Sequence, residues 1–129
     1  MDNIDLMNYW FNSSDKDYDT MQFLYKGNKN SWALFIGHLV IEKLLKGLYA
    51  KANIENPIAP KIHNLILLSQ KANLEVPQNI REKIQVINTF NIGARYDDYK
   101  ESFEQKCTDE FTKKQISNIE EVRRWLKKQ

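Results

Sequence analysis

Residues that interrupt helices are scarce in this chain, which has four glycines and three prolines among its 129 residues. The apolar residues between them recur mostly at intervals of three and four, the period of one helix face, rather than at the interval of two that marks a strand. The pattern therefore predicts an all-α protein. Because a chain of this length usually makes one domain, we expect residues 1–129 to form a single helical domain.

The first two helices are marked by breaker and capping residues. One is expected over about residues 4–26 with Gly27 just after its end, although the run NSSDKD that follows Phe11 could break it in two. The second begins after Ser31, a natural N-cap, and ends before the run NIENPIAP, where two prolines favour extended backbone.

Three further helices are expected over about residues 63–72, from Pro77 to Gly93, and from Thr108 or Asp109 onward. A polar loop is expected to follow Gly93 and to lead into the last helix. Five amphipathic helices joined mostly by short turns predict an up-and-down antiparallel bundle.

The second helix is the most apolar, with hydrophobic residues on more than one face, so we expect it to have the largest buried surface. Gly37 and Gly47 lie inside it. We interpret them as points of close packing against a neighbouring helix rather than as part of a phosphate-binding loop.

The overall composition excludes some functions. Nineteen lysines and arginines nearly balance 17 aspartates and glutamates, and the net charge of +2 gives no general reason for binding nucleic acid or an anionic membrane. The acidic N-terminus does not resemble a signal peptide, and no apolar run reaches the roughly 18 residues of a membrane span. We therefore expect a cytoplasmic protein without membrane contact.

Few residues suit metal or thiol chemistry. Cys107 has no second cysteine, and His38 and His63 fall on different expected helices, so we predict no metal site, no cofactor and an incidental thiol. His38 is expected to fill the edge of the core, and His63 to cap or orient the turn before the third helix.

Glu42, Lys43 and Lys46 form a charged group within the apolar second helix. Glu42 and Lys46 have the spacing of an ordinary surface pair, worth only about 0.2 to 0.5 kcal/mol. The same three side chains would also suit a cleft between helices. Both interpretations remain open at this point.

Arg95 lies in the run NTFNIGARYDDYK, where the helical pattern changes to a polar one. Its guanidinium is always charged and offers paired donors to a phosphate or a carboxylate. Asp97 and Asp98 are close enough to hold it in an internal salt bridge. Alternatively, Arg95 points into a cleft beside Lys43, Lys46 and Tyr96 and binds a nucleotide phosphate or an acidic group of a partner.

The motifs FIGHLVIEKLLKGLYAK, PKIHNLILLSQ and FNIGARYDDY occur in the order and spacing of the HEPN family, the higher eukaryotes and prokaryotes nucleotide-binding domains, and the chain resembles that family over nearly its whole length. The resemblance implies a helical bundle of the nucleotidyltransferase substrate-binding-subunit type that forms a homodimer. The resemblance also rests on an early tryptophan followed by an aspartate, which are Trp10 and Asp17 here. The other matching positions are His38, Glu42, Lys43 and Lys46 in the second helix, Pro60 to His63 in the turn before the third, and the pair Arg95 and Tyr96.

Many HEPN domains are metal-independent ribonucleases with an arginine, four to six residues and a histidine. Here the histidine position falls on Lys100, Glu101 or Ser102, and an aspartate replaces the proline of the RYP form typical of the other branch. The resemblance therefore implies a nucleotide-binding or partner subunit of a minimal nucleotidyltransferase, in a system of toxin–antitoxin type, that is not catalytic alone. In that reading Arg95, Tyr96, Lys43 and Lys46 bind the anion, and His38, Glu42 and Asp17 support them.

Two alternatives remain. The first is a divergent RNA-cleaving toxin in which Tyr96 or Tyr99 replaces the missing histidine as proton carrier, with RNA as the ligand. The second is a helical interaction module without a ligand.

Overall fold

A computed structural model describes residues 2–91 and 97–129 of the chain. Every regular element within these residues is a helix, which confirms the all-α class. No helix in the described ranges has the length and apolar character that a membrane span requires. The helices are α1 (Asn3–Lys26), α2 (Asn30–Ala52), α3 (Leu65–Lys71), α4 (Gln78–Asn88), α6 (Asp97–Lys106) and α7 (Asp109–Lys127).

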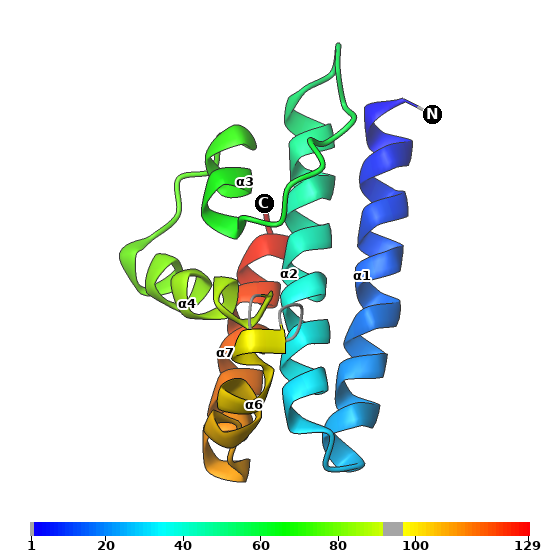
Figure 1. The fold of residues 1–129 in the computed structure, drawn as a ribbon. Coiled ribbons are helices and arrows are strands. Elements are labelled where there is room, and N and C mark those ends of the chain that lie inside the picture. The colour runs from blue at the N-terminus through cyan, green and yellow to red at the C-terminus, as the bar shows by residue number, and fades with distance from the viewer. Residues whose placement is uncertain (1, 92–96) are drawn as a thin grey trace.

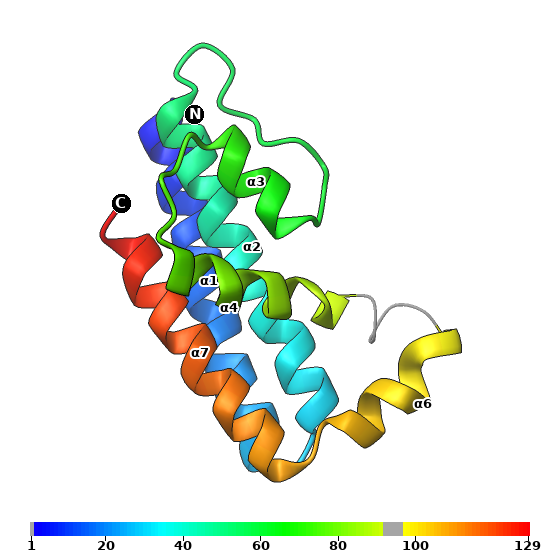
Figure 2. The same ribbon diagram turned by 90° about the vertical axis from the view of Figure 1, so that its left-hand side faces the viewer.

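Helix α2 is the centre of the fold. It forms a long antiparallel hairpin with α1, and it also contacts α3, α4, α6 and α7 (Figure 1). In both views α1 lies on one side of α2, and α3 and α4 lie on the other (Figure 2). The side chains of α2 therefore have neighbours in several directions.

The arrangement differs from the expected five-helix up-and-down bundle. Helix α7 runs in the same direction as α2 rather than opposite to it, and α4 lies across α7 instead of alongside (Figures 1 and 2). The described residues also contain six helices. The expected antiparallel packing of successive helices therefore holds clearly for α1 and α2, but not for the whole molecule.

Helix α6 occupies part of the stretch that we expected to be a polar loop. Its sequence, DDYKESFEQK, has few apolar residues and so gives a weak periodic signal. One of them, Phe103, is only 8% exposed and packs on Phe90 with 5.8 Å between the ring centroids. Phe103 thus anchors α6, whose other described side chains, at residues 100–102 and 104–106, are exposed. The helix expected from Pro77 to Gly93 is shorter than predicted, because α4 ends at Asn88 with Thr89 as its C-cap; Gly93 itself lies outside the described residues.

Helix α1 is continuous, so the run NSSDKD does not break it. Ser14 in this run is buried, but its hydroxyl donates a hydrogen bond to the carbonyl of Val40 at 2.7 Å. A buried hydroxyl with a partner costs little. At the end of α1, Gly27 has φ −86°, and Asn28 takes the left-handed conformation with φ 61°. The predicted end of the helix was right, but the left-handed residue is the asparagine.

The observed starts of α2 and α3 differ from the expected starts by one or two residues. Helix α2 starts at Asn30, so the prediction that Ser31 is its N-cap was wrong. Helix α3 begins at Leu65, after Asn64, whose side chain accepts a hydrogen bond from the backbone N–H of Leu67. Helix α7 begins at Asp109, one of the two expected starts, and the side chain of Thr108 caps it.

The core is built around α2, which has more buried residues than any other described helix, as predicted. A Cβ atom added at Gly37 would lie 2.5 Å from Cδ1 of Ile119 on α7. One added at Gly47 would lie 2.7 Å from the ring of Phe11 on α1. Both glycines are therefore points of close helix packing, which confirms their interpretation.

Candidate functional site

A group of polar residues joins α1 to α2 along one side of the hairpin. The Nζ atom of Lys43 on α2 lies 2.7 Å from the carboxylate of Asp17 on α1. The same ammonium group donates a hydrogen bond to the hydroxyl of Ser13 at 2.8 Å. Lys43 is thus held by α1 at the surface, where about a fifth of its side chain is exposed.

Directly before Lys43 in α2, Glu42 is a buried carboxylate with 4% exposure. Its Oε2 accepts a hydrogen bond from Nζ of Lys46 at 3.2 Å, and its Oε1 lies 2.8 Å from Nδ1 of His63. Nδ1 of His38 is 3.7 Å from the same Oε1. Since an unpaired buried carboxylate is strongly unfavourable, these neighbours explain how Glu42 can lie inside the protein.

The two histidines have different roles. His38 is fully buried, and its Nε2 lies 3.1 Å from the backbone carbonyl of His63, so it ties the segment before α3 to α2. The side chain of His63 is 45% exposed. Because an ionised carboxylate can only accept hydrogen bonds, Nδ1 of His63 donates to Glu42, and Nε2 is the nitrogen that remains for another partner.

An aromatic ring completes the group. Nζ of Lys46 lies 5.4 Å from the centroid of the Trp10 ring on α1, within the range of a cation–π contact. Trp10 also packs edge to face against Tyr9. We call the whole group the polar strip: Trp10, Ser13, Asp17, His38, Glu42, Lys43, Lys46 and His63.

Charge is balanced within the polar strip. Its two lysines face two carboxylates, Asp17 with Lys43 and Glu42 with Lys46. An anionic ligand would therefore need a further positive charge, from a protonated histidine or from a residue outside the strip. Within the described part of the chain, no three His, Cys, Asp or Glu side chains are placed to hold a metal ion.

The structure thus brings five of the expected site residues together: Asp17, His38, Glu42, Lys43 and Lys46. The Glu42–Lys46 pair forms as predicted, but it is buried rather than on an exposed face. Arg95 and Tyr96 lie outside the described residues, as does the possible salt bridge to Asp97 and Asp98.

Sequence reasoning missed three members of the site: Trp10, which was only a matching position of the HEPN pattern, Ser13 and His63. Ser13 had no signal of its own, because its role depends on which turn of α1 faces Lys43. His63 was expected only to cap or orient a turn, yet it is a direct partner of Glu42. Its match to the PxxH turn of the HEPN pattern was the available signal.

Cys107 lies outside the polar strip. Its side chain is 6% exposed, and burial raises the pKa of the thiol to about 11. The thiolate is the reactive form, so very little of it is present at neutral pH. This agrees with the interpretation of Cys107 as an incidental thiol.

Comparison with known proteins gives one match. A family model described as HEPN domain matches residues 7–129. No curated protein and no solved structure matches the chain. The matched range includes every residue of the polar strip and extends beyond it to the end of α7.

Proposed function

This chain belongs to the HEPN domain family, and we propose that it binds a nucleotide at the polar strip, as the binding or partner subunit of a minimal nucleotidyltransferase in a system of toxin–antitoxin type. In this proposal the domain binds rather than catalyses. The observation that supports it is the convergence of Lys46 and His63 on Glu42, because it fixes one cation and one imidazole beside the same buried carboxylate.

Such an arrangement favours recognition. Glu42 orients the His63 ring so that Nε2 is available to a ligand, and Lys46 is held between the carboxylate and the Trp10 ring. Side chains that are already positioned lose little conformational entropy when a ligand binds. A phosphate group would find donors in place, with an aromatic ring close by.

The balanced charge of the strip assigns a specific role to Arg95. We propose that Arg95 supplies the missing positive charge, with Tyr96 beside it, while Lys43 and Lys46 support the bound phosphate. Arginine suits this role because its guanidinium can donate two parallel hydrogen bonds to one phosphate. The competing arrangement is an internal salt bridge of Arg95 with Asp97 or Asp98.

Two properties of the whole protein are part of the same proposal. The first is a homodimer, which the family pattern implies and which large apolar side chains that remain exposed on the α1–α2 hairpin favour; the second is a cytoplasmic location. The exposed apolar side chains are Ile4, Tyr9 and Phe23 on α1 and Trp32 on α2.

One observation favours a second candidate function, cleavage of RNA. A half-exposed imidazole oriented by a carboxylate is a common form of general base. His63 and Glu42 make such a pair at 2.8 Å. With Arg95 to stabilise the charge on phosphate, this pair could replace the histidine that is absent after Arg95.

Calorimetric titration of ATP, GTP and their monophosphates tests the binding proposal. We expect the wild type to bind at least one of them, and Arg95→Ala to weaken binding by about 1.5 to 3 kcal/mol, the value of a charged hydrogen bond. Arg81→Ala, which removes an arginine from α4 outside the strip, is the matched control and should bind like the wild type.

If the wild type binds none of these nucleotides, the proposal is wrong. Equal weakening by both arginine variants would point to general electrostatic attraction instead of a site. Incubation with tRNA and mRNA tests the second candidate. Cleavage that disappears in both Arg95→Ala and His63→Ala would establish the ribonuclease in place of the binding subunit.

A further inference from the structure

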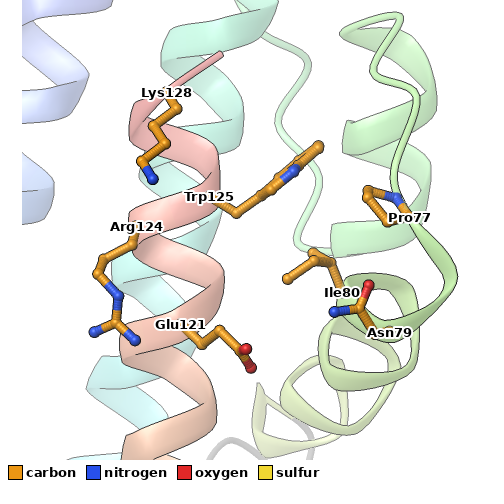
Figure 3. Close-up of a pocket in the computed structure, with 7 residues that line it drawn as sticks. All are labelled: Pro77, Asn79, Ile80, Glu121, Arg124, Trp125 and Lys128. Carbon is orange, nitrogen blue, oxygen red and sulfur yellow. The ribbon is translucent and has the colours of Figure 1, made fainter.

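A cavity lies away from the polar strip, between the start of α4 and the last turns of α7 (Figure 3). Its volume is about 330 Å³. This is at the lower end for a small-molecule pocket, and it is large enough for one anchoring side chain. It is lined by Pro77, Asn79 and Ile80 from the α4 side and by Glu121, Arg124, Trp125 and Lys128 from the α7 side.

The inner part of this cavity is an apolar slot. Figure 3 shows the Trp125 ring extending from α7 toward Pro77, with Ile80 beneath it on α4. Ile80 and Trp125 both belong to or pack on the core, so the slot is a continuation of the packed interior. An aliphatic side chain that enters the slot would contact Pro77, Ile80 and Trp125, and its apolar surface would be removed from water.

The outer edge of the cavity carries unpaired positive charge. Within the described part of the chain, no carboxylate lies within ion-pairing distance of Arg124 or Lys128, and both side chains are exposed. Their sequence neighbours Arg123 and Lys127 differ, because Asp15 on α1 binds both.

The one acidic residue of the cavity does not cancel this charge. Glu121 forms an ion pair with Lys83 of α4. In Figure 3 its carboxylate points toward α4, whereas Arg124 points away from α4 and the Lys128 side chain lies over α7. The cavity therefore combines an apolar slot with two cations that have no carboxylate partner among the described residues.

We propose that this cavity binds an acidic peptide segment of a partner protein, in which an apolar residue stands between two acidic residues. Arg124 and Lys128 are one turn apart, which is about 6 Å along a helix axis. Residues two apart in an extended chain are separated by about 6.6 Å and point to the same side, and the residue between them points to the other. Two carboxylates can thus meet the cations while the middle side chain enters the slot.

The test uses a blocked synthetic peptide in which leucine stands between two glutamates, titrated into the ¹⁵N-labelled full chain at millimolar concentration. The indole N–H signal of Trp125, assigned with Trp125→Phe, and the amide of Ile80 should shift and saturate. The double variant Arg124→Ala/Lys128→Ala should weaken binding by about tenfold or more, because two charged contacts are lost.

Lys113→Ala/Lys114→Ala is the matched control, since it removes two exposed lysines from the other end of α7. It should bind the peptide like the wild type. The proposal is overturned if both double variants lose binding equally, if the shifts do not saturate, or if they appear at the polar strip. It is also overturned if ATP shifts the Trp125 signal and the peptide does not. The cavity shares no residue with the polar strip, so this result is independent of nucleotide binding there.

Discussion

At the scale of single residues, the polar strip depends on Glu42. This carboxylate is nearly inaccessible to solvent, and it is the direct partner of Lys46 and His63. Lys46 is itself only 8% exposed. Removing the negative charge would leave a nearly buried ammonium group without its counter-ion, which costs more than the loss of an ordinary surface pair.

We therefore expect Glu42→Gln, which keeps the size of the side chain, to lower the free energy of unfolding by about 3 kcal/mol. Glu75→Gln, at an exposed position, should change it by less than about 0.5 kcal/mol. Urea unfolding measures both. Adding Lys46→Met to Glu42→Gln should restore part of the loss. A Glu42→Gln protein as stable as the wild type would show that Lys46 does not need this partner.

The sequence allowed part of this site to be predicted. The spacing of Glu42 and Lys46 predicts their pairing, because residues four apart meet on a helix. Spacing could not show that the pair is buried, since the cover comes partly from His63, which is 21 positions further along the chain. The same limit applies to Lys43, whose partners on α1 depend on how the two helices are rotated about their axes.

At the scale of helices, the two glycines of α2 set how closely its neighbours approach, but they do so against different surfaces. At Gly37 the nearest atoms are the ends of two flexible side chains, Ile119 and Met21. At Gly47 they are the ring of Phe11 and, at 3.2 Å, the backbone carbonyl of Met7. A backbone atom and an aromatic ring have less room to move than the end of an aliphatic chain.

Gly47→Ala should accordingly lower the melting temperature, although alanine is the better helix former by about 1 kcal/mol. We expect a net loss of about 1 to 2 kcal/mol from overpacking. Gly37→Ala should cost at least about 1 kcal/mol less, because its neighbours can adjust. Calorimetric melting of the two variants gives the comparison. The reverse order would mean that α1 moves away from α2 more easily than the side chains on α7 rearrange.

Most helices could be predicted because their apolar residues follow the helical period over several turns. Helix α6 was missed because Phe103, the one buried residue among its described side chains, gives no helical period. The sequence pattern also could not predict the direction in which α7 runs. Short connections favour antiparallel neighbours. Helices α3 and α4, however, are too short to extend along the whole length of α2. The chain therefore enters α7 at the end of the molecule where α2 also begins.

At the scale of the whole molecule, α1 is joined to α7 by polar contacts. Asp15 binds Arg123 at 3.1 Å and Lys127 at 2.6 Å, and Tyr25 donates to Asp109 at 3.0 Å. Burial raises the pKa of the Asp15 carboxyl, but the hydrogen bonds and charges of Lys127 and Arg123 outweigh it. The pKa therefore lies below its ordinary value of 3.8.

A lowered pKa in the folded state means that Asp15 stabilises the protein above the unfolded-state pKa, and that this contribution is lost as the pH falls through the folded value. Because 46% of the side chain is exposed, we expect Asp15→Asn to cost no more than about 1 kcal/mol at pH 7. The difference should shrink as the pH falls below 3.8 toward the lower folded-state pKa. Denaturant unfolding at pH 7 and at a series of acidic pH values, with the exposed Asp19→Asn as control, checks this. A difference that grows in acid would contradict it.

The central place of α2 also determines where this protein can tolerate change. A substitution in α2 meets a neighbouring helix on almost every side, so most new side chains there are too large, too small or too polar. Helix α1 has one packed side, and its outer face carries residues such as Phe23, which is 78% exposed. In a population of variants we therefore expect more differences on the outer face of α1, away from the apolar residues proposed for self-association, than in α2, which carries half of the polar strip.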